Sequence, residues 1–133
     1  MISHICIGVN DFPRAFAFYA PLLDMIGWKM KFRDDERPWA VWKTPDCDRP
    51  LLLLGKSFDG RPASQGNGQM LALLAASRET VDEVYRMAVE SGASCEGPPG
   101  PRPEYHANYY GAYFRDPEGN KLCICCHHEE PQG

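Results

Sequence analysis

The sequence predicts an α+β fold of two βαβββ modules that form a curved, mixed eight-stranded sheet with a concave pocket. Three observations lead to this prediction. Alternating apolar positions, typical of strands, are followed by a helical repeat of apolar positions and then by further strands. The same order restarts later in the chain, with His4 and Met70 at equivalent points 66 positions apart. The chain ends in a predicted β-hairpin whose turn is residues 116–120.

The first module is expected within about residues 1–60. Residues 2–9 alternate between apolar and small or polar side chains and are predicted to form a strand. Asn10 is a good helix N-cap, and residues 11–26 carry apolar side chains at helical spacing, so a helix is expected there. The remaining strands of this module are predicted at residues 28–33, 39–43 and 51–54.

The second module is expected within about residues 67–128. Residues 97–103 are rich in proline and glycine and are predicted to form a stiff, polyproline-like loop. The other predicted elements are, in order, a strand, a helix capped by Ser77, a short strand and the two strands of the hairpin: residues 70–76, 78–91, 93–96, 109–115 and 121–127.

A four-stranded sheet with a single helix leaves one face uncovered. Two such modules can cover each other by joining into one curved sheet with both helices on the convex side. The concave side then becomes a pocket within one domain that spans residues 1–133. Because side chains alternate along a strand, Cys123, Cys125 and His127 are expected to face away from Leu122.

Composition excludes some classes of protein. An apolar fraction of 44% is enough for a packed core, and a net charge of −4 argues against a nucleic-acid partner. No apolar run is long enough to cross a membrane, and the N-terminal segment lacks the basic-then-apolar pattern of a signal peptide. Six cysteines without a secretory signal are interpreted as reduced thiols, so we expect a cytoplasmic protein.

Two segments carry a recognisable pattern. The first, HICIGVNDFPRAFAFYAPLLDMIGW, begins at His4, and the second, NYYGAYFRDPEGNKL, contains the tight turn before the last strand. Together with the duplicated βαβββ order, they resemble the vicinal oxygen chelate superfamily, the group of glyoxalase I, bleomycin-resistance proteins and extradiol dioxygenases. The resemblance covers nearly the whole chain. It implies the fold predicted above and, as in many members, a homodimer.

In that superfamily the concave face holds a divalent metal, usually through His on the two first strands and Glu or Gln on the two last strands. The resemblance places His4, Met70 and Cys123 at three of these positions, and the strand at residues 51–54 offers no carboxylate or amide. Since the usual ions need oxygen and nitrogen donors, we expect no cofactor and no metal of the usual kind. A soft-metal site that includes His4 and Cys123 is the alternative, because thiolate and imidazole suit Zn²⁺ or Cu(I).

The candidate site residues are those expected on the concave face and at its mouth. His4 or His106 would act as acid or base in an enzyme, although each is also explained as a hydrogen-bonded histidine. The simplest interpretation of Cys123 is a small space-filling side chain. Trp42 and Phe58 are further aromatic candidates, although some of the aromatic side chains must lie in the core. The predicted pocket residues are Cys6, Met70, Ala72, Cys123, Cys125, Trp39, Tyr105 and Tyr109.

Two classes of function follow from the resemblance. One is an enzyme of the lyase or dioxygenase type with a remodelled site, either metal-free or, like a lactoylglutathione lyase, metal-dependent but with soft ligands. The other is a small-molecule-binding protein of the bleomycin-resistance type, which sequesters an aromatic or cationic compound. Arg33, Arg37 and Arg102 are candidates for orienting an anionic substrate, although arginines near turns are usually solvated. We expect a small-molecule ligand or substrate, no nucleic acid and no membrane.

Overall fold

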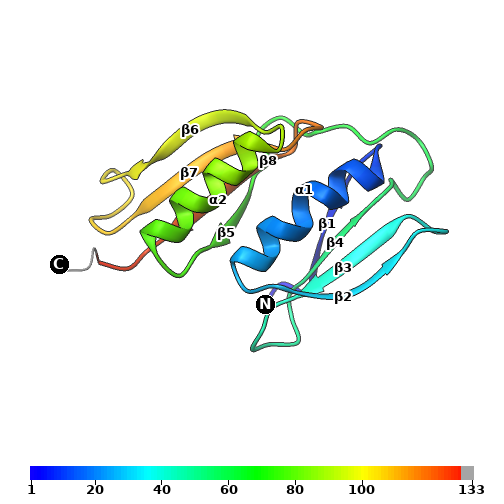
Figure 1. The fold of residues 1–133 in the computed structure, drawn as a ribbon, viewed down its shortest axis with the longest axis horizontal. Coiled ribbons are helices and arrows are strands. Elements are labelled where there is room, and N and C mark those ends of the chain that lie inside the picture. Colours follow the sequence, from blue (N-terminus) through cyan, green and yellow to red (C-terminus); the bar gives the residue numbers. More distant parts are fainter. Residues whose placement is uncertain (130–133) are drawn as a thin grey trace. The chain divides into compact units, whose positions relative to one another are not determined.

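The computed structural model describes residues 1–129 as two compact units, Met1–Gly66 and a second unit that begins at Asn67 (Figure 1). Each unit contains one helix and four strands in the order βαβββ. The predicted α+β class and the two βαβββ modules are therefore confirmed. The strands hydrogen-bond as two four-stranded sheets, one in each unit, and both sheets mix parallel and antiparallel pairs.

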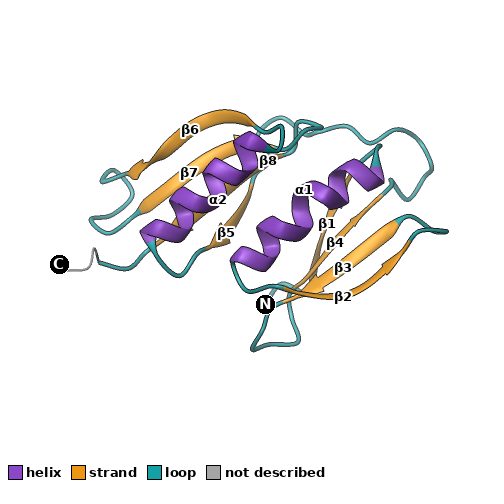
Figure 2. Ribbon diagram, viewed as in Figure 1, coloured by secondary structure: helices purple, strands orange, loops and turns teal. Residues whose placement is uncertain are grey.

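The first unit consists of β1 His4–Gly8, α1 Phe12–Met25, β2 Lys29–Asp34, β3 Trp39–Lys43 and β4 Leu51–Gly55. The strands lie in the order β1-β4-β3-β2, with β1 parallel to β4 and the other neighbours antiparallel. The helix lies across one face of the sheet (Figure 2). We call the opposite face of each sheet its helix-free face.

Alternation along the strands decides which side chains contact α1. The ring of Phe16 in α1 lies 5.7 Å from the ring of Trp42 in β3, so Trp42 is a core residue and not a pocket residue. Leu52 pairs with Trp42 and is fully buried on the same face. Leu53 follows Leu52 in β4 and pairs with Cys6 of β1. Because side chains alternate along a strand, Leu53 and Cys6 point to the helix-free face.

The N-terminus of α1 differs from the prediction. Its N-cap is Asp11, whose carboxylate accepts a hydrogen bond from the Arg14 N–H at 3.2 Å. Asn10 does not cap the helix. Its Nδ2 donates to the Ala63 carbonyl at 3.0 Å, and its Oδ1 accepts from the Ala63 N–H at 2.7 Å. The prediction was wrong because the partner of Asn10 is distant in sequence, and local patterns do not reveal such a partner.

The second unit consists of β5 Leu71–Leu74, α2 Arg78–Glu90, β6 Ser94–Pro101, β7 Tyr110–Arg115 and β8 Lys121–Cys126. The strands lie in the order β5-β8-β7-β6, with β5 parallel to β8. The predicted cap of α2 is confirmed, because the Ser77 hydroxyl accepts from the Thr80 N–H at 3.1 Å. In both units the chain thus builds the same arrangement of one helix and four strands.

The proline-rich segment is the main error in the predicted secondary structure. Most of it belongs to β6, although it was predicted to be a polyproline-like loop. β6 is an edge strand, and its pairing with β7 shifts register on either side of Gly97. An edge strand with an irregular ladder tolerates proline, because fewer of its N–H groups are needed for pairing.

The predicted turn at residues 116–120 is present and is held by a buried carboxylate. Asp116, only 3% exposed, accepts hydrogen bonds from the N–H groups of Glu118 and Asn120, each at 2.9 Å. It also accepts from the Asn120 side chain at 2.9 Å. Gly119 adopts a φ of 96°, which favours glycine. The turn thereby fixes β8 against β7.

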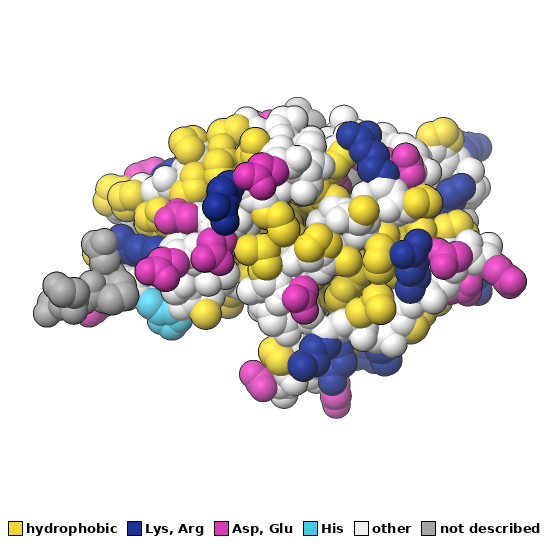
Figure 3. Space-filling view, viewed as in Figure 1, with side chains coloured by type: hydrophobic (Ala, Val, Ile, Leu, Met, Phe, Trp, Pro, Cys, Tyr) yellow, Lys and Arg dark blue, Asp and Glu magenta, His cyan; other side chains and the backbone are white. Residues whose placement is uncertain are grey.

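No helix within residues 1–129 is long and apolar enough to span a membrane. On the face of the molecule shown in Figure 3, acidic and basic side chains are interspersed.

Candidate functional site

The helix-free face of the first sheet carries a pocket of about 480 Å³. Its lining residues come from β1, from the start of β3 and the turn before it, from β4 and from the connection after β4. Cys6 and Trp39, two of the predicted pocket residues, lie in this lining, together with Leu53 and Phe58. All of the residues that line the pocket belong to the first unit.

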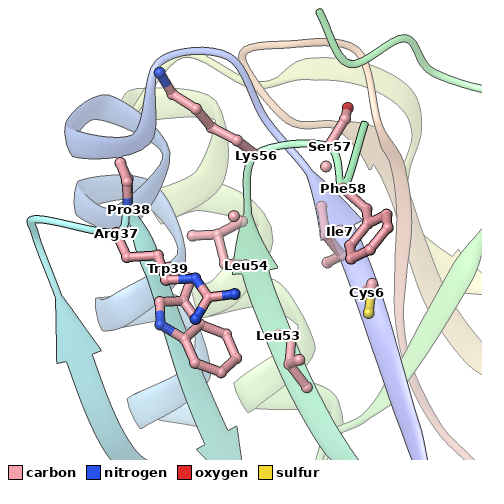
Figure 4. A pocket seen from close by; sticks show the side chains of 12 residues that line it. Cys6, Ile7, Arg37, Pro38, Trp39, Leu53, Leu54, Lys56, Ser57 and Phe58 are labelled. Atoms are coloured by element: carbon pink, nitrogen blue, oxygen red, sulfur yellow. The ribbon is translucent and has the colours of Figure 1, made fainter. Parts of the chain in front are cut away.

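Aromatic side chains stand on opposite sides of the pocket. Figure 4 shows the Arg37 guanidinium beside the Trp39 ring, with Phe58 across the pocket near Ile7. Phe32 packs edge-on against the Trp39 ring, with 4.8 Å between the centroids, and so supports it from the side. The Phe58 side chain is fully exposed to solvent. The Trp39 wall of the pocket is therefore held in place by packing, and the Phe58 wall is free to adjust to a ligand.

The pocket is cationic although the whole chain carries a net charge of −4. Arg37 and Lys56 line it, and none of the lining residues within the described chain carries a carboxylate. The Arg37 guanidinium carbon lies 5.9 Å from the centre of the Trp39 ring. Figure 4 shows the Arg37 guanidinium at this apolar, partly enclosed surface and the Lys56 side chain directed away from it, so Arg37 is the positive charge that attracts an anionic ligand.

The connection after β4 passes close to β1 and to Asn10, and its path shapes the pocket. The bidentate contact of Asn10 with Ala63 anchors the connection that carries Lys56 and Phe58. A Cβ at Gly8 would lie 3.2 Å from the Ala63 Cβ, so glycine there lets the connection pass close to β1. The sequence identified Asn10 as a polar residue at a helix start, but it did not indicate this role.

The other predicted residues of the first strands lie outside this pocket lining. His4 is exposed on β1, and its Nδ1 is 2.9 Å from the Ser3 hydroxyl. Met70 is 46% exposed and precedes β5. Ala72 is exposed on β5 and pairs with Cys123. The described structure thus brings Cys6 and Trp39 together but leaves His4 with a serine as its hydrogen-bonding neighbour.

A second group of predicted residues gathers on the helix-free face of the second sheet. The ring of Phe114 contacts Tyr85 of α2 at 6.4 Å, so the alternate position, Tyr113, faces the other way. Tyr113 pairs with Cys123, and the Tyr109 hydroxyl lies 2.8 Å from the Tyr113 hydroxyl and 3.5 Å from the Cys123 sulfur. Sequence reasoning missed Tyr113, although the same alternation that placed Cys123 identifies it.

Two histidines border this cluster. His106 Nε2 lies 2.8 Å from His127 Nδ1, and His127 Nε2 lies 3.8 Å from the Cys125 sulfur. Both imidazoles contact the Tyr109 ring, at centroid distances of 5.7 Å and 5.3 Å. Tyr105 is 63% exposed and packs edge-on against Tyr109. His106 therefore hydrogen-bonds His127, which directly follows β8, and the backbone N–H of Asn108.

Hydrogen bonding shifts the pKa values of the Cys123 and Cys125 thiols in opposite directions. The Cys125 thiol, supported by hydrogen bonds from Tyr109 and Tyr113 and by the charge of Arg102, lowers the pKa of Cys123 to about 7 against the opposing effect of burial. The same thiol–thiol contact, together with burial, raises the pKa of Cys125. Burial raises the pKa of both Tyr109 and Tyr113, so these phenols stay neutral hydrogen-bond donors.

The residues at the superfamily's metal positions do not fit its usual divalent ion. Among residues 1–129, no three His, Cys, Asp or Glu side chains gather in a geometry able to hold a metal ion. The donors actually present are the His4 imidazole, the Met70 thioether and the Cys123 thiol, and that thiol is engaged by the Tyr109 hydroxyl. One nitrogen donor with two soft sulfurs is a poor set for Ni²⁺, Fe²⁺ or Mg²⁺.

A family model, a relative in sequence and a solved structure are each similar to this chain over most of its length. The family model for the Glyoxalase/Bleomycin resistance protein/Dioxygenase superfamily matches residues 1–124. The uncharacterized protein YraH of Bacillus subtilis (strain 168) is 29% identical over 123 residues, which cover 87% of this chain and 90% of that protein. The crystal structure of a glyoxalase/bleomycin resistance protein from Albidiferax ferrireducens T118 is similar, with a TM-score of 0.83 and 32% identity, covering 95% of this chain and 98% of that one.

A lactoylglutathione lyase from Agrobacterium tumefaciens shares the fold, with a TM-score of 0.60 and 23% identity over 95% of this chain and 92% of that chain. At this identity the likeness concerns the fold and not the activity. The match of the family model over nearly the whole chain agrees with the resemblance of the two sequence segments. This chain belongs to the Glyoxalase/Bleomycin resistance protein/Dioxygenase superfamily.

Proposed function

We propose that this protein binds a small organic anion with an aromatic or otherwise apolar body in the pocket of the first unit. The observation that carries the proposal is the lining of that pocket, in which Trp39 and Phe58 supply aromatic surface and Arg37 supplies positive charge. For a binding protein the sequence suggested an aromatic or cationic compound, and for a substrate it offered Arg37 among the residues that could orient an anion. The position of Arg37 in the pocket lining favours an anion.

The pocket has the size and chemistry for one small molecule. Its volume of about 480 Å³ lies in the range of ligand pockets, about 300–1,000 Å³. A planar ring lies against Trp39 and over Leu53 on the helix-free face, while a carboxylate or sulfonate meets the Arg37 guanidinium. Arginine recognises such groups through two parallel hydrogen bonds, which fixes the orientation of the ligand.

The residues of the pocket support a protein that binds this ligand without converting it. A lyase or dioxygenase of the usual kind needs a divalent ion at the substrate, and the donor set of this chain does not suit one. The pocket lining within the described residues contains the Cys6 thiol but no histidine or carboxylate to act as an acid or base. The homodimer and the cytoplasmic location remain predictions from the sequence.

The test is a titration with 1-naphthoate, followed by tryptophan fluorescence and calorimetry. Arg37→Gln should bind about tenfold more weakly than the wild type, because one charge-assisted contact is lost. The matched control is Arg86→Gln, the same change at an exposed position of α2 in the second unit, and it should bind as the wild type does. Equal affinity of Arg37→Gln and wild type would contradict the proposal, as would the absence of binding by the wild type.

A further inference from the structure

A row of three paired residues crosses the first sheet at the pocket. Trp39 of β3 pairs with Gly55 of β4, and Gly55 pairs in turn with Gly8 of β1. Gly55 lies two positions beyond Leu53, and Gly8 lies two positions beyond Cys6, so the row belongs to the helix-free face. All three residues line the pocket. One large aromatic side chain therefore stands beside two neighbouring positions that carry no side chain.

The two glycines leave bare backbone as the floor of the pocket beside Trp39. We call Gly8 and Gly55 together the glycine strip. Neither residue has a positive φ, so backbone conformation does not demand glycine here. Space does, because a Cβ at Gly55 would lie 3.0 Å from the Trp39 Cβ, and a Cβ at Gly8 would lie 3.2 Å from the Ala63 Cβ. Since both glycines are partly exposed, the strip is a flat surface that a ligand can reach.

The glycine strip lies between a fixed aromatic ring and an exposed one. Trp39 is held by the edge-on contact with Phe32, with 4.8 Å between the ring centroids. Phe58 lies on the β1 side of the pocket, across from Trp39 (Figure 4). Its connection is anchored where Asn10 binds Ala63, but the Phe58 side chain itself is fully exposed. Burying that ring against an apolar body in the pocket would be favourable, because it removes apolar surface from water.

We propose that the pocket selects anions whose apolar body is a flat aromatic ring system, which lies on the glycine strip with Phe58 closed over its outer face. This preference rests on the proposed binding function and narrows it to planar aromatic carboxylates and similar anions. A two-ring body that begins over Leu53 continues over the strip, about 3.5–4.0 Å above the backbone atoms, which is the best separation for contact between carbon atoms. Its edge meets Trp39, and its anionic group meets Arg37.

The shape of the ligand decides how much contact this arrangement gives. A flat ring system touches the glycine strip with one face and Phe58 with the other, so both faces leave water. A cage-shaped body touches a flat floor with only a few atoms and keeps Phe58 farther from the floor. Dispersion contacts weaken steeply across even a small gap, and the cage has no ring face to stack on Phe58. Gly8, Gly55 and Phe58 therefore act as specificity-determining residues.

The test compares two anions of equal charge and equal carbon number, flat 1-naphthoate and cage-shaped adamantane-1-carboxylate, by calorimetry. The wild type should bind 1-naphthoate about tenfold more tightly, because only the flat body is contacted and stacked on both faces. Equal affinities, or tighter binding of the cage, would overturn the proposed preference and leave the anion-binding function standing. Binding of neither anion would contradict the binding function itself, and the preference with it.

Gly8→Ala places a methyl group on the floor of the pocket. It should weaken binding of 1-naphthoate about tenfold, because the flat body is lifted off the backbone, and should weaken adamantane-1-carboxylate much less. The matched control is Gly97→Ala in β6 of the second unit, where the added Cβ also meets a neighbour at 3.2 Å, the Tyr113 side chain. It should leave both affinities unchanged.

Phe58→Leu tests the closing ring without altering the floor, and it spares the core because Phe58 is fully exposed. Leucine keeps an apolar side chain but has no ring face. Binding of 1-naphthoate should weaken about fivefold through the loss of stacking. The affinity for adamantane-1-carboxylate should stay unchanged and serves as the control within the same variant. A preference for the flat anion that survives in both Gly8→Ala and Phe58→Leu would also overturn the proposal.

Discussion

At the scale of single residues, a few positions separate this chain from the metal chemistry of its superfamily. His4 occupies one of the usual ligand positions, but its imidazole lies beside the Ser3 hydroxyl and belongs to no group of three or more His, Cys, Asp or Glu side chains able to hold a metal ion in the described structure. Met70 and Cys123 hold two of the other positions. A thioether and a buried thiol supply soft donors where hard divalent ions need oxygen or nitrogen.

We therefore expect protein purified without added metal or chelator to contain far less than one equivalent of any transition metal by elemental analysis. His4→Ala should contain the same small amount, because His4 is not part of a ligand set. Near-stoichiometric metal in the wild type that falls in the variant would show that the sulfur donors and His4 form a metal site after all.

The sequence predicted the position of single side chains correctly where the alternation of side chains along a strand decides it. Alternation placed Cys123 and Cys125 on the face opposite Leu122, and the structure agrees through the pairing of Tyr113 with Cys123. It gave no signal for Lys56 in the pocket, because that residue lies in an irregular connection whose path depends on the distant contact of Asn10 with Ala63. Arg37 was a candidate for binding an anion, but only the fold shows that it stands beside Trp39.

At the scale of elements, β4 shows how one strand serves both the core and the pocket. Leu52 is fully buried against the α1 side of the sheet, whereas Leu53 faces the pocket. Both residues are leucines, and they are adjacent in the sequence. Substituting each one in turn therefore compares an effect on stability with an effect on ligand binding.

Leu52→Ala should lower the free energy of unfolding by about 2–5 kcal/mol, because it leaves a cavity in the core. Leu53→Ala should cost less stability, since Leu53 is only partly buried, but it should weaken binding of 1-naphthoate. Chemical denaturation and calorimetry measure the two effects. A loss of affinity in Leu52→Ala larger than that in Leu53→Ala, at a temperature where both variants are folded, would contradict the placement of the pocket.

Element boundaries were predictable where a local signal marks them, as at the Ser77 cap and the Asp116 turn. They were not predictable where tertiary position decides. The segment that ends at Pro101 forms β6 because it lies at the edge of a sheet, and its prolines alone predicted a loop.

At the scale of the whole molecule, the chain uses a duplicated superfamily fold to present two different surfaces. The helix-free face of the first unit is an open, cationic and aromatic pocket. The corresponding face of the second unit is a closed cluster of thiols and phenols. The fold followed from the repeated βαβββ order, but the chemistry of each face depends on individual side chains, as expected for a fold that hosts many functions.

The most direct test of this account is a calorimetric titration of the wild-type protein, with chelator present throughout, using three naphthalene probes that differ only in charge. The probes are 1-naphthoate, neutral 1-naphthalenemethanol and the cation 1-naphthylmethylammonium. The account predicts that the anion binds about tenfold more tightly than the neutral probe and that the cation binds most weakly, because the Arg37 guanidinium lies at the pocket. Equal affinities, or tightest binding of the cation, would contradict it.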